Sequence, residues 1–127
     1  MPLVPIREYR GYTDIATISD GTTNTLMLGE KHVVRGREGR ESTGDHSCYN
    51  GVGYNSAQRV AGSSFPLARD PLDTSSNYPD KFGGPHPSVV LFAMCDGSVR
   101  GIRRSIDSTN LKRLAIRNDG QVITTDY

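Results

Sequence analysis

Several features that mark other classes of protein are rare or absent in this sequence of 127 residues. Tryptophan is absent, and the longest apolar run, Val89–Cys95, has the length of a strand. A transmembrane helix needs about 20 apolar residues, so we expect no membrane contact by this segment. Fifteen basic residues stand against 14 acidic ones, for a formal net charge of +1. Because phosphate backbones favour proteins with a marked basic excess, nucleic acid is not an expected partner.

Turn-forming residues are abundant: the chain has 14 glycines and 7 prolines, against a hydrophobic fraction of 35%. Together with the strand patterns described below, this composition predicts a β-rich α+β fold with an antiparallel sheet and long loops. We expect one domain over residues 1–127. Residues 35–47 predict an exposed loop. Residues 55–81 are polar and interrupted by prolines, so we expect them either to contain short strands or to wrap the sheet.

The first strand is expected at Thr25–Val34. The consecutive apolar residues 26–28 indicate burial on both faces of that strand, and Gly29 indicates a bulge or a close approach of two backbones. Upstream, Thr13 is expected to cap a short helical turn.

A hairpin is predicted by the residues that follow Pro87. Val89–Met94 is rich in strand-forming residues, Asp96-Gly97 supplies a tight turn, and Ser98–Ile102 returns. Val90, Phe92 and Met94 share one face, and Val99 is expected to face inward on the return.

One helix is predicted near residues 107–117, with Asp107 as its N-cap. Asn118 or Gly120 is expected to end it in the left-handed conformation. Gln121–Thr125 then predicts a last short strand.

Metal-binding signals are weak. His46 and Cys48 are two residues apart, but no second pair has the spacing of a structural zinc site, and no calcium-binding loop is present. We expect no cofactor; His46, Cys48 and His86 are the candidate ligands if calcium or zinc binds. Cys48 and Cys95 form either one disulfide or two separate thiols, and the sequence leaves both alternatives open.

Catalytic patterns are missing as well: there is no nucleophile elbow, phosphate-binding loop or dinucleotide fingerprint. The protein is therefore not expected to be an enzyme. An alternative function is a glycan- or metal-binding module, in which Tyr49, Tyr54 and Tyr78 form a stacking surface.

Two blocks of residues nonetheless stand out. The first block is Ile18–Thr25, followed by Gly29-Glu30. In the second, His86 is followed by nine residues and then by Asp96-Gly97. Both blocks resemble the signatures of the bacterial prepilin-type processing-associated domain family, a domain of unknown function. The residues that carry the resemblance are Asp20, Gly21, Asn24, Thr25, Gly29, Glu30, His86, Asp96 and Gly97.

The resemblance implies the β-rich head of a type II secretion pseudopilin, which projects on the extracytoplasmic side and contacts protein partners, other pilin-like subunits among them. Members of the family typically carry a leader and a long hydrophobic helix, which this chain lacks, so we expect a detached head. By local reasoning, Asp20 and Asn24 shape their own turn, and His86 hydrogen-bonds neighbouring backbone at the entrance of a strand. We therefore expect the signature residues to be structural.

Overall fold

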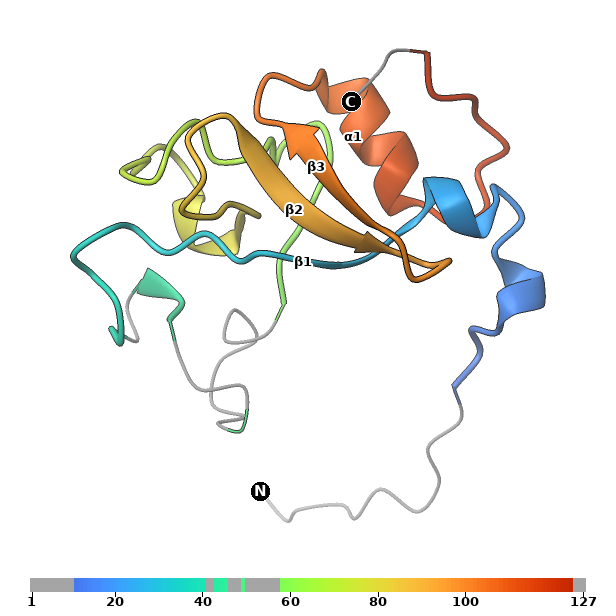
Figure 1. The fold of residues 1–127 in the computed structure, drawn as a ribbon, viewed down its shortest axis with the longest axis horizontal. Coiled ribbons are helices and arrows are strands. Elements are labelled where there is room, and N and C mark those ends of the chain that lie inside the picture. Colours follow the sequence, from blue (N-terminus) through green and yellow to red (C-terminus); the bar gives the residue numbers. More distant parts are fainter. Residues whose placement is uncertain (1–10, 41–42, 46–48, 50–57, 125–127) are drawn as a thin grey trace, which may run out of the picture.

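The computed structural model describes residues 11–40, 43–45, 49 and 58–124. Within these residues lies a three-stranded antiparallel sheet in the order β1-β2-β3, together with one α-helix and several 3₁₀ turns. The predicted α+β fold with an antiparallel sheet is confirmed. Figure 1 shows β2 between its two neighbours, with α1 beside β3.

The predicted hairpin forms the centre of the sheet. Strands β2 (Val89–Met94) and β3 (Val99–Arg103) pair in register, with Val90 opposite Ile102 and Ala93 opposite Val99. Side chains alternate along β2, so that Val90, Phe92 and Met94 are buried as predicted. The prediction for Val99 is wrong, because its place opposite Ala93 directs it to the outer face.

Strand β1 (Leu26–Gly29) is shorter than the predicted strand Thr25–Val34. It pairs with β2 through an irregular register between Leu26 and Leu28, so the bulge lies before Gly29, which itself pairs with Phe92. Burial on both faces was predicted for residues 26–28 and is wrong, since Met27 and Leu28 are exposed.

Helix α1 (Ser108–Ala115) confirms the predicted helix and its cap. The side chain of Asp107 accepts hydrogen bonds from the amides of Thr109 and Asn110. The helix ends at Ile116, which is extended, so the expected left-handed residue does not occupy the C-cap. Gly120 takes a positive φ of 67° in the following turn.

The core lies between α1 and the inner face of the sheet. Its buried residues come from β2, β3, α1 and the loop before Ala68: Leu67, Val90, Phe92, Met94, Ile102, Leu111 and Leu114. Residues 55–81 were expected either to contain short strands or to wrap the sheet. In the described part, 58–81, there are isolated bridges but no strand, and Leu67 packs into the core beside the sheet.

Two further local predictions are corrected. The 3₁₀ turn Ile15–Thr17 is capped by Asp14 and not by Thr13, because the Asp14 side chain accepts a hydrogen bond from the Thr17 amide. Residues 121–124 form no strand. Among the described residues, no helix has the length and apolar character needed to cross a membrane.

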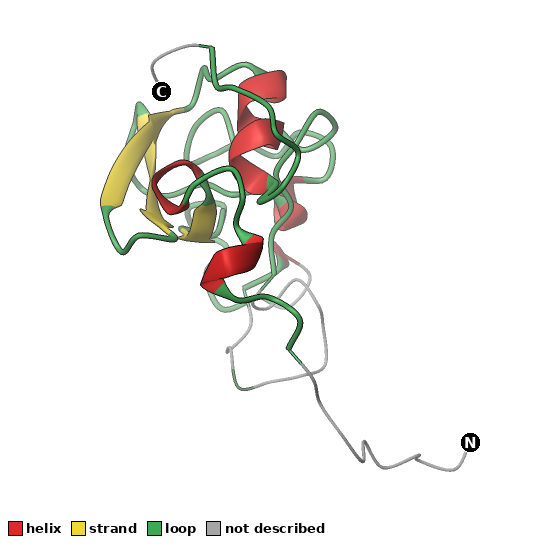
Figure 2. Ribbon diagram, turned by 90° about the vertical axis from the view of Figure 1, so that its right-hand side faces the viewer, coloured by secondary structure: helices red, strands yellow, loops and turns green. Residues whose placement is uncertain are grey.

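The two faces of the sheet differ. Figure 2 shows α1 on one side of the strands, and among the described residues no helix lies over the other side. Leu28 and Val99 lie on this outer face and are 66% and 68% exposed. A sheet normally covers its apolar face with a second layer. The exposure of these two apolar side chains on the outer face is therefore the least expected feature of the fold.

Candidate functional site

The first signature block is a tight turn that leads into β1. Gly21 has a positive φ of 91°, a conformation that favours glycine. Asn24 closes the 3₁₀ turn Thr22–Asn24, and its amide donates to the carbonyl of Gly21. Thr25 is buried, and its hydroxyl donates to the same carbonyl at 3.0 Å. The predicted turn-forming role of these residues agrees with this geometry.

Asp20 acts at long range. One carboxylate oxygen accepts the amide of Asp119 at 2.8 Å, and the other accepts the amide of Gly120 at 2.9 Å. Burial acts to raise the pKa of Asp20, but these bonds outweigh it and lower the pKa. Asp20 was predicted to shape its own turn; the two bonds of its carboxylate attach the first block to the loop after α1 (Figure 1).

The second block forms the turn of the hairpin. The Asp96 carboxylate accepts the amide of Ser98 at 2.9 Å and its hydroxyl at 2.7 Å, and both bonds lower the pKa of Asp96. Gly97 follows with a φ of 85°. This confirms the predicted Asp-Gly turn.

The two blocks contact each other through their backbones. The amide of Asp96 donates to the carbonyl of Thr22 at 3.1 Å, and the amide of Cys95 donates to the carbonyl of Thr25 at 2.9 Å. The motifs therefore meet at one end of β2.

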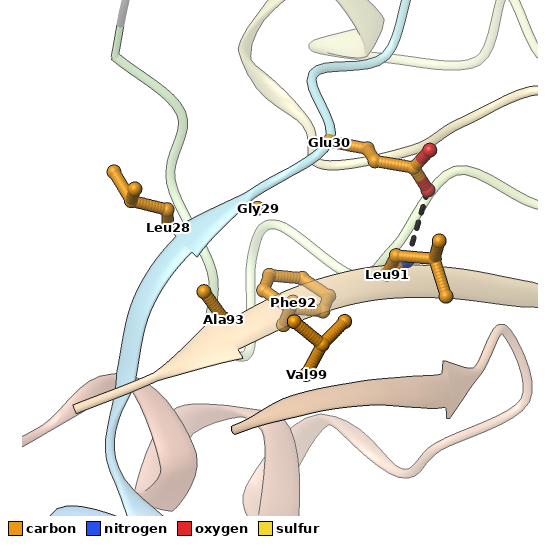
Figure 3. Close-up of a pocket in the computed structure, with 7 residues that line it drawn as sticks. All are labelled: Leu28, Gly29, Glu30, Leu91, Phe92, Ala93 and Val99. Carbon is orange, nitrogen blue, oxygen red and sulfur yellow. Dashed lines mark hydrogen bonds between the residues drawn. The ribbon is translucent and has the colours of Figure 1, made fainter. Parts of the chain in front are cut away.

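Gly29 and Glu30 join β1 to the middle of β2. A Cβ atom on Gly29 would lie 2.4 Å from Cε1 of Phe92, so glycine is required by the close approach anticipated there. The amide of Glu30 donates to the carbonyl of Leu91, and a Glu30 carboxylate oxygen accepts the amide of Leu91 at 2.9 Å (Figure 3). This carboxylate thus continues the β1–β2 pairing beyond the end of the strand.

His86 lies at the other end of β2 from Asp96. Its Nε2 is 3.6 Å from a carboxylate oxygen of Glu30, and 45% of its side chain is exposed. The predicted bond from the imidazole to neighbouring backbone is not among its contacts; instead, the His86 carbonyl accepts from the Arg104 guanidinium. The whole of β2 separates His86 from Asp96, so the motif does not bring these two side chains together.

Arg104 was missed by the sequence analysis. Its guanidinium donates to the carbonyls of Ala68, Gly84 and His86, so one side chain holds two loops against the end of β3. Burial lowers the pKa of Arg104. An arginine directly after a strand is unremarkable in sequence, and nothing local indicates its distant acceptors.

A buried polar cluster was also missed. The Asp73 carboxylate is inaccessible and accepts the amides of Arg69 and Ser75; Lys81, also buried, lies 3.8 Å away. Burial opposes ionisation of Asp73, but these hydrogen bonds lower its pKa. His32 joins the cluster through Nε2, which is 2.8 Å from the carbonyl of Asp73.

The metal hypothesis gains no site among the described residues, where no three His, Cys, Asp or Glu side chains are placed to hold an ion. His46 and Cys48 lie outside the described residues, and His86 faces Glu30. The two alternatives for Cys48 and Cys95, one disulfide or two separate thiols, both stand, because Cys48 lies outside the described residues. The thiol of Cys95 is half-buried, 3.9 Å from the carbonyl of Leu26.

Of the three tyrosines in the glycan hypothesis, Tyr49 and Tyr78 are among the described residues. Tyr78 packs edge-on against the ring of His32, with 6.4 Å between the centroids. Tyr49 is exposed, and Tyr54 lies outside the described residues.

The outer face of the sheet carries a shallow apolar hollow of about 250 Å³. Leu28, Ala93 and Val99 form one row across the three strands, and Leu91 lies in the next row beside Glu30 (Figure 3). This hollow can offer apolar contact, with a carboxylate at its border. No signal in the sequence predicted it, because Val99 was expected to face inward.

Residues 5–109 match a family described as "protein of unknown function (DUF1559)". No curated protein and no solved structure matches the chain significantly.

Proposed function

Because the chain belongs to the DUF1559 family of proteins of unknown function, a membership that assigns no activity, we propose its function from the arrangement of its signature residues. We propose a non-catalytic structural and interaction domain that resembles the extracytoplasmic head of a type II secretion pseudopilin. Its partners are other proteins, with pilin-like subunits as the first candidates.

One observation carries this proposal: the signature carboxylates all bind backbone amides. Asp20 accepts the amides of Asp119 and Gly120, Glu30 accepts that of Leu91, and Asp96 accepts that of Ser98. These hydrogen bonds lower the pKa of Asp20 and of Asp96, which makes the two carboxylates poorly suited to deliver a proton. These carboxylates therefore fix the backbone conformation, which is the role expected in a scaffold.

The separation of His86 and Asp96 supports the same proposal. A catalytic or metal-binding pair must bring its side chains to one point, within about 3 Å of a shared atom. These two residues stand at opposite ends of β2 and contact different loops. The nine residues between them contain strand β2 and the residues that flank it.

The extracytoplasmic location rests on the resemblance and is tested in cells. We would fuse an epitope tag to the C-terminus encoded by the chromosomal gene and compare immunoblots with and without the host's prepilin peptidase. If the chromosomal gene encodes a leader ahead of this segment, the product is longer in cells without the peptidase; in either case external protease removes the tag from spheroplasts.

A tagged cytoplasmic enzyme in the same cells is the control and stays protected from the protease. Equal length in both strains, combined with protection from external protease, would refute the pseudopilin-like assignment. An Asp96→Asn variant that folds normally provides a second test. It should reach the same location as the unchanged chain, because a scaffold tolerates this change if the turn is retained.

A further inference from the structure

A second hollow, of about 460 Å³, lies where the first signature block, the start of β1 and the end of α1 meet. It shares no lining residue with the hollow on the outer face of the sheet. We call it the α1-end hollow. Its volume lies within the range of about 300–1,000 Å³ that is typical of ligand sites. Its apolar wall is formed by Ile18, Leu26, Met27, Ala115 and Ile116.

Backbone hydrogen bonds hold the walls of the α1-end hollow together. The amide of Asp20 donates to the carbonyl of Arg117 at 3.1 Å, which joins the first block to the residues after α1. The amide of Cys95 donates to the carbonyl of Thr25 at 2.9 Å, which joins the turn after β2 to the start of β1. Because the site is formed before a ligand arrives, little ordering of the chain opposes binding.

Arg117 is the only charged residue among those that line the hollow. Within the described part of the chain, its guanidinium makes one hydrogen bond, from Nη1 to the carbonyl of Thr17 at 3.3 Å, and has no carboxylate partner. The neighbouring carboxylate of Asp20 accepts the amides of Asp119 and Gly120 instead. A guanidinium has five N–H donors, so Arg117 retains donors for an anion.

The hollow therefore combines one cation with an apolar wall. One cation matches a carboxylate better than a phosphate monoester, which carries about −1.5 to −2 charges. The wall is open to solvent, since Met27 and Ala115 are exposed, so it suits a short apolar group better than a long acyl chain. A short apolar group beside a carboxylate is what the last residue of a protein chain presents.

The position of β1 favours a peptide in particular. Leu26 and Met27 belong to this strand, and among the described residues no strand pairs with the side of β1 that faces away from β2. The edge of a sheet can form main-chain hydrogen bonds with an extended peptide, which a simple fatty acid cannot use.

We propose that the α1-end hollow binds the C-terminus of another protein chain, with an apolar last side chain against Met27 and its carboxylate on Arg117. The inference rests on the proposed function, in which the domain contacts protein partners, and it names the chemistry of one such contact. It also gives the two signature blocks a shared role beyond their turns, because Ile18, Thr25 and Cys95 all line the hollow.

The test is an NMR titration of the full chain, labelled at the methyl groups of isoleucine and methionine, with two short peptides. One is N-acetylated Gly-Ala-Leu with a free C-terminal carboxylate, and the other is the same peptide with a C-terminal amide. We expect the acid to cause saturable shifts at Ile18, Met27 and Ile116. The amide should bind about tenfold more weakly, because a hydrogen bond to a charged group contributes more than a neutral one.

Arg117→Gln should lower the affinity for the peptide acid to that for the amide, because the charge that distinguishes them is lost. Arg113→Gln is the matched control. Arg113 also donates to a backbone carbonyl, that of Val122, but it does not line the hollow. The control variant should keep the preference for the acid.

Met27→Glu tests the apolar wall and spares the core, since Met27 is 54% exposed. A carboxylate at this position repels that of the peptide and should abolish binding. Leu28→Glu is the control, because Leu28 is the next residue, is 66% exposed and lines the outer-face hollow instead. It should bind the peptide acid as the unchanged chain does.

Octanoate distinguishes a chain end from any apolar acid. If octanoate binds at the same methyl groups as tightly as the peptide acid, the proposal is overturned. The absence of saturable shifts up to millimolar peptide, or equal affinity for acid and amide, would overturn it as well. None of these results would refute the pseudopilin-like assignment, because processing and location in cells do not depend on this hollow.

Discussion

The carboxylate of Asp20 accepts the amide of Gly120, a residue 100 positions further along the chain. A second bond, from the amide of Asp20 to the carbonyl of Arg117, runs the other way at 3.1 Å. The first signature block therefore holds the loop that follows α1, and α1 covers the core face of the sheet. Asp20, which belongs to the first block, thus makes contacts with residues far from that block in the sequence.

Replacing Asp20 with Asn should release this loop. An amide side chain has one acceptor oxygen in place of two, so the N–H of Asp119 or of Gly120 loses its partner. We expect a lower melting temperature and faster hydrogen exchange at those two amides. Asn118→Ser on the same loop is the control, and unchanged exchange in Asp20→Asn would contradict the assignment.

Gly29→Ala should destabilise the fold by about 1–3 kcal/mol, because the added Cβ collides with the Phe92 ring. Gly101→Ala is a matched control on another strand, where the nearest atom to a Cβ is Val89 Cβ at 3.6 Å. Urea unfolding of both variants in dilute solution measures the difference. Equal free energies of unfolding would show that the approach of Gly29 to Phe92 is not tight.

The parts of the fold that the sequence predicts are local. The turn at Asp96-Gly97 and the cap at Asp107 each satisfy backbone groups within three residues, so their signals lie within a short window. Both were predicted and are confirmed. The alternation Val90, Phe92, Met94 is equally local, since it depends on the pleat of a single strand.

The errors concern contacts between distant segments. Val99 was expected to face inward, but its face follows from pairing with Ala93, and a hydrophobic pattern does not specify that register. Arg104 donates to a carbonyl on another loop, and His32 contacts the carbonyl of Asp73, 41 positions away, with no repeated spacing to reveal either contact. The candidate site follows the same rule: its turns were predictable, and the bonds that join them were not.

Asp73→Ala should be among the most destabilising single changes, at about 3–5 kcal/mol, because it leaves the buried ammonium of Lys81 without its carboxylate. Arg69→Ala is the control: it removes the other cationic partner, whose side chain is 73% exposed. Its effect should be below about 1 kcal/mol.

The double variant Asp73→Ala/Lys81→Met separates charge from packing. Removing both charges should recover part of the lost stability, as measured by chemical unfolding. Additive losses in the double variant would show that the two residues do not interact.

The free energy of unfolding should fall as the pH is lowered through about 6.5, because of His32. This imidazole is buried; its Nε2 is 2.8 Å from the Asp73 carbonyl, and its Nδ1 has no hydrogen-bond partner among the described residues. Burial lowers the pKa of His32 below the ordinary value of 6.5, and the charges of Arg104 and Lys81 add to the effect.

Near pH 6.5 His32 therefore binds a proton in the unfolded chain, whereas in the folded chain it stays neutral. Below that pH the free energy of unfolding falls by about 1.4 kcal/mol for each unit of pH, until the pH reaches the lowered pKa of His32 in the folded state. Unfolding between about pH 8 and about pH 5 measures this slope. His32→Gln, which keeps a donor for the Asp73 carbonyl but does not titrate, should flatten it. If the imidazole resonances of His32 in the folded protein titrate at the ordinary value, the burial argument fails.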